Sequence, residues 1–80
     1  MQKVVDKEFL IALGKRVREL RLSKEMTQED LGYIVGNSGK QIGRIERGEN
    51  NVTTSMIFQI SKALNITLSE LLDFPVKSDK

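Results

Sequence analysis

The sequence contains no cysteine and no histidine. Without cysteine, the chain forms neither a disulfide framework nor a thiolate metal site. Without histidine, it lacks both the commonest general base of enzymes and the commonest metal ligand of proteins. It also shows no pair of carboxylates placed for catalysis and no glycine-rich phosphate loop. The sequence therefore argues against an enzyme and predicts no metal ion, no other cofactor and no small-molecule ligand.

Long apolar runs are also missing. No apolar stretch approaches the roughly 20 residues that a membrane-spanning helix needs. The N-terminal run MQKVVDKEFL carries charges inside its apolar stretch, which distinguishes it from a signal peptide. We therefore expect no membrane contact and a cytoplasmic location.

The composition that remains is that of one folded domain. Hydrophobic residues make up 39% and charged residues 30% of the 80-residue chain, as is typical of globular proteins. The single proline, Pro75, follows the last apolar pattern. We predict one domain over residues 1–80, with a core from about 7 to 74 and a frayed tail at 75–80.

The net charge of +2 is a weak argument for nucleic-acid binding, but the cations are unevenly distributed. They gather in two segments, which hold Lys15, Arg16, Arg18, Arg21 and Lys24, and then Lys40, Arg44 and Arg47. The C-terminal run LSELLDF carries acids and no cation. This asymmetry favours a molecule with one phosphate-facing side, although a run of cations also fits an ordinary solvated helix face.

Apolar periodicity predicts an all-α fold, a compact bundle of five helices without strands. The helices are expected at about 6–23, 28–35, 39–47 and 54–64, with a short fifth helix ending near Leu72. The residues expected to face the core are Leu10, Leu13, Val17, Leu20, Leu31, Ile34, Val35, Ile42, Ile45, Ile57, Ile60 and Leu64.

Capping residues mark the ends of these helices. Thr27 with Asp30, and Thr67 with Glu70, have the spacing of a capping box, in which side chains and backbone N–H groups pair reciprocally. The other expected starts are at Ser38 and Thr53, and the other expected ends are at Gly36, Asn37, Gly48 and Asn65.

Residues 27–48 are the most informative segment, because a turn of only a few residues joins two short helices there. Such helices cross steeply and form a helix-turn-helix unit, whose second helix is free to enter a DNA major groove. Five motifs follow in order: TQEDL, GNS, IGRIERG, ISKAL and LSELL. Over about residues 10–72 the chain thereby resembles the Cro/C1-type (XRE-like) helix-turn-helix DNA-binding proteins. The resemblance implies a lambda-repressor-like fold, with the helix-turn-helix formed by the second and third helices.

The resemblance and side-chain chemistry together nominate DNA-binding residues. Arginine pairs with guanine and glutamine with adenine through two hydrogen bonds each, and phosphate contacts position the protein. The expected base contacts are Lys40, Gln41, Arg44, Ser38 and Gly39. The expected phosphate contacts are Gln28, Thr27, Arg47, Asn50, Asn51, Lys15 and Arg16. Asn50 and Asn51 also fit ordinary turn positions.

Two glycines depart from the family pattern. Gly39 and Gly43 occupy positions in the third helix where the family usually has side chains. Together they cost the helix about 2 kcal/mol of intrinsic propensity. Either the backbone approaches DNA closely at these positions, or glycine is simply tolerated there.

The resemblance further implies a structural ion pair between Arg21 and Glu46, which would lock the first helix against the third. The alternative for Arg21 is a direct contact with DNA.

A homodimer on double-stranded DNA is expected, because one helix reads too few base pairs to select a site in a genome. The candidate interface consists of apolar residues beyond the inner stripe of the two C-terminal helices, namely Met56, Phe58, Leu72 and Phe74. The alternative for Phe58 is a place in the core against the first helix. The predicted function is sequence-specific transcriptional regulation by a repressor or autoregulator on an inverted-repeat operator. An antitoxin-like or other protein-interaction module with secondary DNA binding is the alternative.

Overall fold

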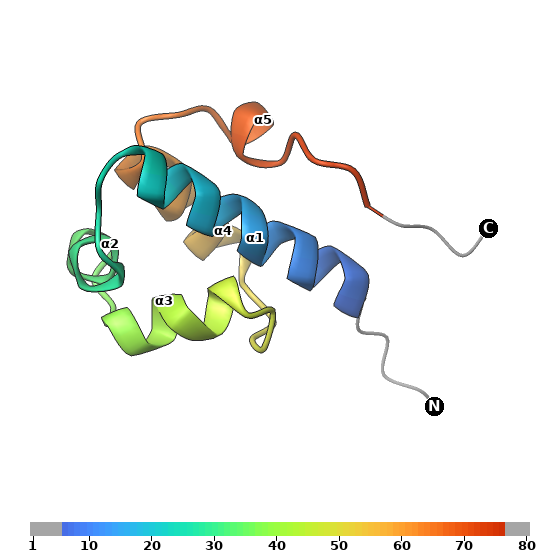
Figure 1. Cartoon of the computed structure of the whole chain (residues 1–80), viewed down its shortest axis with the longest axis horizontal. Helices are drawn as coiled ribbons and strands as arrows, with labels where there is room; N and C mark the ends of the chain where they lie inside the picture. Colours follow the sequence, from blue (N-terminus) through green and yellow to red (C-terminus); the bar gives the residue numbers. More distant parts are fainter. Residues whose placement is uncertain (1–5, 77–80) are drawn as a thin grey trace.

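The computed structural model describes residues 6–76, which form five helices and no strand. The helices are α1 (Lys7–Ser23), α2 (Gln28–Ile34), α3 (Gly39–Glu46), α4 (Thr54–Ala63) and α5 (Leu68–Leu71) (Figure 1). Each ends at the expected residue or one residue before it, so the predicted all-α fold is confirmed. Of the predicted tail, Pro75 and Val76 are not helical, and residues 77–80 lie outside the described part of the chain.

Local hydrogen bonds explain where the helices begin. The Thr27 hydroxyl accepts from the backbone N–H of Asp30, whose carboxylate accepts from the Thr27 N–H, both at 2.9 Å. Thr67 and Glu70 form the second predicted capping box. Ser38 caps α3 as expected, by accepting from the N–H of Gln41 at 3.2 Å. These contacts span three residues, which is why the sequence alone reveals them.

The helices end where the backbone adopts left-handed geometry. Gly36 and Gly48 have φ angles of 72° and 74°, and Asn65 has 59°. Such conformations suit glycine and are tolerated by asparagine. The sequence did not indicate Glu25, which has a φ of 58° in the connection between α1 and α2.

The apolar core lies among all five helices. Figure 1 shows α3 beneath α1, α2 at one end of this pair, and α5 above α1. The buried core residues are Leu13, Val17, Leu31, Ile42, Ile45, Ile60, Leu64 and Leu71. No helix within residues 6–76 is both long enough and apolar enough to cross a membrane.

The close approach of α1 to α3 depends on Gly14. A Cβ atom at this position would lie 2.4 Å from the carbonyl oxygen of Ile45 and 2.5 Å from that of Glu46. A side chain would therefore force the two helices apart. The contact at Gly14 therefore allows the short distance between α1 and α3. It also explains why glycine stands in the middle of a helix, where its intrinsic propensity is unfavourable.

The predicted inner face of α2 was wrong at one position. Ile34 is 54% exposed and Val35 is half-buried, whereas Leu31 is fully buried. A Cβ at Gly32 would lie 2.5 Å from the Ser38 backbone, so α2 packs through Gly32 against the start of α3. A seven-residue helix that crosses its neighbours steeply contacts the core over about one turn, which leaves Ile34 outside.

Candidate nucleic-acid interface

A row of cations follows the outer side of α3. Lys40, Arg44 and Arg47 succeed one another at four and then three residues, opposite the buried Ile42 and Ile45. Side chains at this spacing share one helix face. We call Lys40, Arg44 and Arg47 the cationic stripe. The cations of α3 therefore lie on one side of the helix, where Lys40 and Arg47 are exposed and Arg44 is half-buried.

Beneath this surface, α1 and α3 are joined by a buried ion pair. The Arg21 Nε and Nη2 atoms donate to the two carboxylate oxygens of Glu46 at 2.6 and 3.1 Å. Arg21 also donates to the carbonyl oxygen of Met26 at 2.7 Å. The two residues are only 4% and 8% exposed. The structure thus brings together the predicted pair, and the burial of Arg21 leaves its guanidinium no access to DNA.

Gln28, the expected phosphate ligand, is attached to this ion pair. Its Nε2 atom donates to Glu46 Oε1 at 3.1 Å, and Arg18 approaches the same oxygen at 3.8 Å. A glutamine amide carries a second N–H and a carbonyl oxygen, and within residues 6–76 the side chain of Gln28 makes no other hydrogen bond than the one to Glu46. The ion pair therefore orients Gln28 at the first turn of α2. Sequence reasoning missed this link, because it depends on how α2 crosses α3.

The structure gives a different reason for the absence of a side chain at Gly39 and at Gly43. A Cβ at Gly39 would lie 2.8 to 3.1 Å from the side chain and backbone of Glu29, so this glycine is needed for α2 to pack on α3. A Cβ at Gly43 would lie 3.2 Å from Arg47 Nη1 and 3.4 Å from the Gln28 amide atoms. The backbone of Gly43 therefore lies close to both of these expected phosphate ligands, where an added side chain would crowd Arg47.

Arg47 is paired with an acid that sequence reasoning overlooked. Its Nε and Nη2 atoms donate to the Glu49 carboxylate at 2.7 and 3.4 Å, and both side chains are exposed. The hydrogen bond from Arg47, and then its positive charge, lower the pKa of Glu49 below its ordinary value. The same contact raises the pKa of Arg47. The pair straddles Gly48, whose left-handed backbone turns the chain back towards α3.

The loop that follows also reaches Gln41, an expected base contact. The Nδ2 atom of Asn50 donates to Gln41 Oε1 at 3.0 Å in a partly buried contact. Asn51, the next residue, is exposed. Asn50 was predicted as a phosphate contact or a turn residue, and the structure places its side chain against Gln41 of α3.

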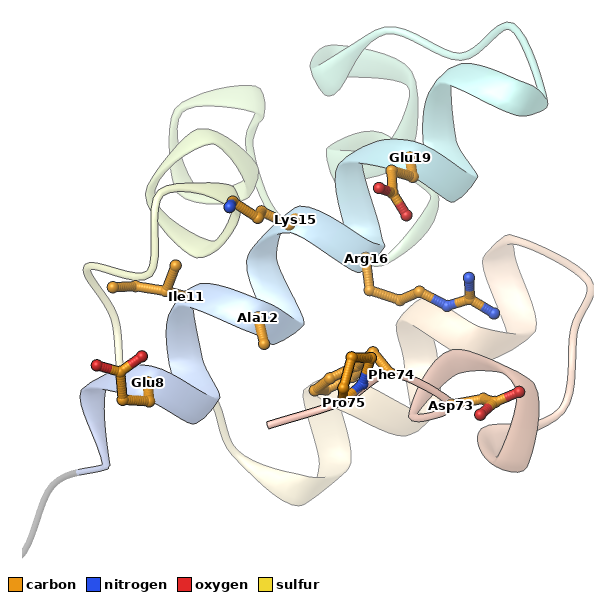
Figure 2. Close-up of a pocket in the computed structure, with 9 residues that line it drawn as sticks. All are labelled: Glu8, Ile11, Ala12, Lys15, Arg16, Glu19, Asp73, Phe74 and Pro75. Atoms are coloured by element: carbon orange, nitrogen blue, oxygen red, sulfur yellow. The ribbon is translucent and has the colours of Figure 1, made fainter. Parts of the chain in front are cut away.

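Four further residues were expected to contact DNA, namely Thr27, Ser38, Lys15 and Arg16. The hydroxyls of Thr27 and Ser38 accept the capping hydrogen bonds described above and lie at exposed positions. Arg16 donates to the carbonyl oxygen of Glu70 in α5 at 2.7 and 3.2 Å. Figure 2 shows Arg16 directed towards the C-terminal segment and Lys15 directed to the other side of α1. Of the two, only Lys15 is directed away from α5.

The four apolar residues expected at a dimer interface separate into two groups. Phe58 is 46% exposed and Leu72 is 40% exposed, so Phe58 does not fill the core. Met56 is half-buried against the core, and the Phe74 ring centroid lies 5.7 Å from that of Phe9 in α1. Phe74 therefore packs within its own chain. Phe58 and Leu72 remain as exposed apolar side chains.

A five-helix fold with an exposed cationic helix set on a helix-turn-helix defines a DNA-binding protein. The family model HTH_3, described as helix-turn-helix, matches residues 17–71. The chain belongs to this family of Cro/C1-type DNA-binding transcriptional regulators.

Among curated proteins, the chain is similar to the control protein C.BamHI of Bacillus amyloliquefaciens, with 43% identity over 65 residues and 80% coverage of both chains. It is 40% identical to the control protein C.SmaI of Serratia marcescens, over 75% of this chain and 71% of that protein.

Solved structures agree with this assignment. The restriction-modification controller protein C.AhdI from Aeromonas hydrophila has a TM-score of 0.75 and 39% identity, covering 78% of this chain and 94% of its own. The P22 c2 repressor, whose structure is a complex with a synthetic operator, has a TM-score of 0.69 and 33% identity, covering 76% of this chain and 92% of its own.

Proposed function

We propose that this regulator binds an inverted-repeat operator as a homodimer, with α3 of each protomer in the major groove. The observation that carries the proposal is the cationic stripe on α3, flanked on one side by Gln28 and on the other by Gln41. A recognition helix needs side chains that reach base edges beside side chains that bind phosphates, and this surface offers both.

In the proposed complex, Lys40, Gln41 and Arg44 face base edges, and Gln28 and Arg47 bind phosphates. Arginine suits guanine because its two donors match the O6 and N7 acceptors. The buried pair beneath α3 keeps the phosphate and base ligands at a constant separation. Such preorganisation reduces the entropy lost when the side chains are ordered on DNA.

The dimer is supported by a physical argument and by exposed apolar surface. A single recognition helix distinguishes too few base pairs to find one site in a genome, and two copies roughly add their binding free energies. Phe58 and Leu72, on α4 and at the end of α5, are the exposed apolar residues for a two-fold contact. Met56 and Phe74 pack against their own chain and are left out of the proposed contact.

The relatives bear on the biological role. Two of them are control proteins, and two solved neighbours, C.AhdI and C.Esp1396I, are restriction-modification controller proteins. We propose a comparable role here, in which the protein controls a small set of genes that include its own. The antitoxin PezA of Streptococcus pneumoniae is also similar, at 30% identity, but the match spans only 38% of that protein. It therefore gives little support to the antitoxin alternative.

Selection of bound duplexes from a random DNA pool tests the proposal, together with sedimentation of the free protein and the complex. We expect an enriched inverted repeat with half-site centres roughly 34 Å apart, and two protomers per duplex. An enriched single half-site, bound by a monomer at full specificity, would contradict the dimer. The absence of any enriched motif would contradict sequence-specific recognition.

A further inference from the structure

The contact between Gln41 and the loop after α3 has a consequence for base recognition. Asn50 Nδ2 lies 3.0 Å from Gln41 Oε1, and both residues are half-buried. Two backbone hydrogen bonds hold the start of this loop, from Gly48 N–H to the Ile45 carbonyl at 3.0 Å and from Glu49 N–H to the Arg44 carbonyl at 2.9 Å. The loop is thus anchored to α3 itself, and it holds Asn50 beside the helix.

We propose that Asn50 determines which end of the Gln41 amide meets the DNA bases, and so sets the base preference at that position. The inference rests on the proposed function, in which Gln41 faces the major groove. A glutamine amide has a carbonyl oxygen that accepts hydrogen bonds and an NH2 group that donates them. Because Asn50 holds the oxygen towards the loop, the NH2 group is the end that points away from it.

This orientation changes the expected partner of Gln41. The usual glutamine–adenine pair needs both ends of the amide, since the oxygen accepts from adenine N6 and the NH2 group donates to N7. An amide whose oxygen is turned towards Asn50 presents its NH2 group, and hence donors, to the groove instead. Guanine presents two acceptors, O6 and N7, in the major groove. The structure therefore assigns Gln41 a preference for guanine over adenine, with Asn50 as its positioning residue.

A phosphate contact by Asn50 has different consequences. Loss of a phosphate ligand weakens binding to all sequences alike, because phosphates carry no base identity. Loss of a positioning residue alters the preference at one base pair and leaves the other positions unchanged. The base frequencies of selected duplexes therefore distinguish a phosphate contact from a positioning residue, whereas a change in affinity alone does not.

The variants Asn50→Ala and Asn50→Asp act on the amide in different ways. Alanine frees the Gln41 oxygen, so adenine should become acceptable and the preference for guanine should fall about tenfold. Aspartate only accepts hydrogen bonds, so it should attract the Gln41 NH2 group and turn the oxygen towards the groove. Selection should then favour adenine or cytosine, which present an amino donor. Asn51→Ala, in the exposed neighbouring residue that is itself an expected phosphate contact, is the matched control. Loss of a phosphate contact weakens all sequences alike, so this variant should leave the base preferences unchanged.

The experiment selects duplexes from a random pool with the full chain and with each variant, and compares base frequencies position by position. Asn50→Ala and Gln41→Ala should affect the same position in each half-site. Thermal melts monitored by circular dichroism verify that each variant is folded. An Asn50→Ala variant that binds more weakly but with unchanged base frequencies would overturn the proposal in favour of a phosphate contact. An Asn50→Asp variant that keeps the wild-type guanine preference would overturn the assigned orientation of the amide.

NMR spectra of the protein without DNA test the contact independently of the proposed function. Gln41→Ala should shift the side-chain amide proton resonances of Asn50 and leave those of Asn51 in place. Unchanged Asn50 resonances would refute the pairing itself, whatever the selections show. A wild-type selection without any enriched motif would refute the proposed function, and the amide spectra would still decide whether Asn50 holds Gln41.

Discussion

Replacing Glu46 with alanine should destabilise the protein far more than the loss of one carboxylate on a surface would. The substitution removes two hydrogen bonds from Arg21, at 2.6 and 3.1 Å, and one from Gln28, at 3.1 Å. Within residues 6–76, it leaves the 4%-exposed Arg21 with the Met26 carbonyl as its one remaining side-chain acceptor. Breaking a buried pair by removing one partner costs about 3–5 kcal/mol.

We expect a loss of about 3 kcal/mol, at the lower end of that range, because Arg21 keeps one hydrogen bond. The total stability of a domain of this size is roughly 4–12 kcal/mol. With a urea m-value of about 1 kcal/mol/M, the unfolding midpoint should fall by about 3 M. Equilibrium urea melts followed by circular dichroism measure this change directly.

Two further variants isolate the pair. Arg21→Met combined with Glu46→Leu replaces the charges with apolar groups of similar size, and it should recover most of the lost stability. The double-mutant cycle should therefore show a strong coupling between the two positions. Glu49→Ala removes a carboxylate from an exposed ion pair and should change the melt little. A loss below about 0.5 kcal/mol for Glu46→Ala would refute the reasoning, because a buried pair cannot be so weakly coupled.

Four other outcomes follow from the interface. Arg44→Ala should lower the DNA-binding free energy by about 1–3 kcal/mol per half-site and relax the base preference at one base pair. Gln28→Ala should instead weaken binding to all sequences alike. An unchanged sequence logo for Arg44→Ala would contradict a base contact by Arg44. Glu49→Gln removes the acid that pairs with Arg47 and frees its guanidinium for phosphate. In filter-binding titrations, DNA affinity should rise a few-fold, and the slope of log affinity against log salt should steepen by about 1 per protomer. Equal slopes for wild type and variant would show that Arg47 makes no phosphate contact. The lowered pKa of Glu49 means that its pair with Arg47 contributes stability above the ordinary glutamate pKa of about 4.5. That contribution is lost as the pH falls through the lower folded pKa. The small difference expected between wild-type and Glu49→Gln melts near pH 7 should therefore vanish in acid, and a difference that persists in acid would exclude the pair as its cause. Finally, Phe58→Glu should sediment as a folded monomer, and a persistent dimer would place the interface elsewhere.

Contacts between residues close in sequence were predictable from the sequence. The capping boxes at Thr27 and Thr67 join residues three apart, so the residue types at those positions largely determine where α2 and α5 begin. The left-handed ends at Gly36 and Asn65 follow from what those residue types tolerate. The same local reasoning failed at Ile34, because periodicity describes the face of a helix and not how much of that face its neighbours cover.

The family resemblance carried the prediction further than local chemistry alone. It pointed to Arg21 and Glu46 as a pair, although the residues are 25 positions apart. It did not reveal the additional link to Gln28. That hydrogen bond exists because α2 packs closely on α3 through Gly32 and Gly39, where a Cβ atom would collide with the other element.

The sequence by itself determined the class of fold, the limits of the helices and the helix that carries the cations, since these depend on periodicity, capping and charge within short segments. Only the tertiary structure decided which side chains meet on the DNA-facing surface. Asn50 reaches Gln41 because the turn at Gly48 brings the loop back beside α3, and Arg47 pairs with Glu49 across the same turn. The direction of a side chain after a turn depends on backbone geometry and packing at that point, which a pattern of residue types does not specify.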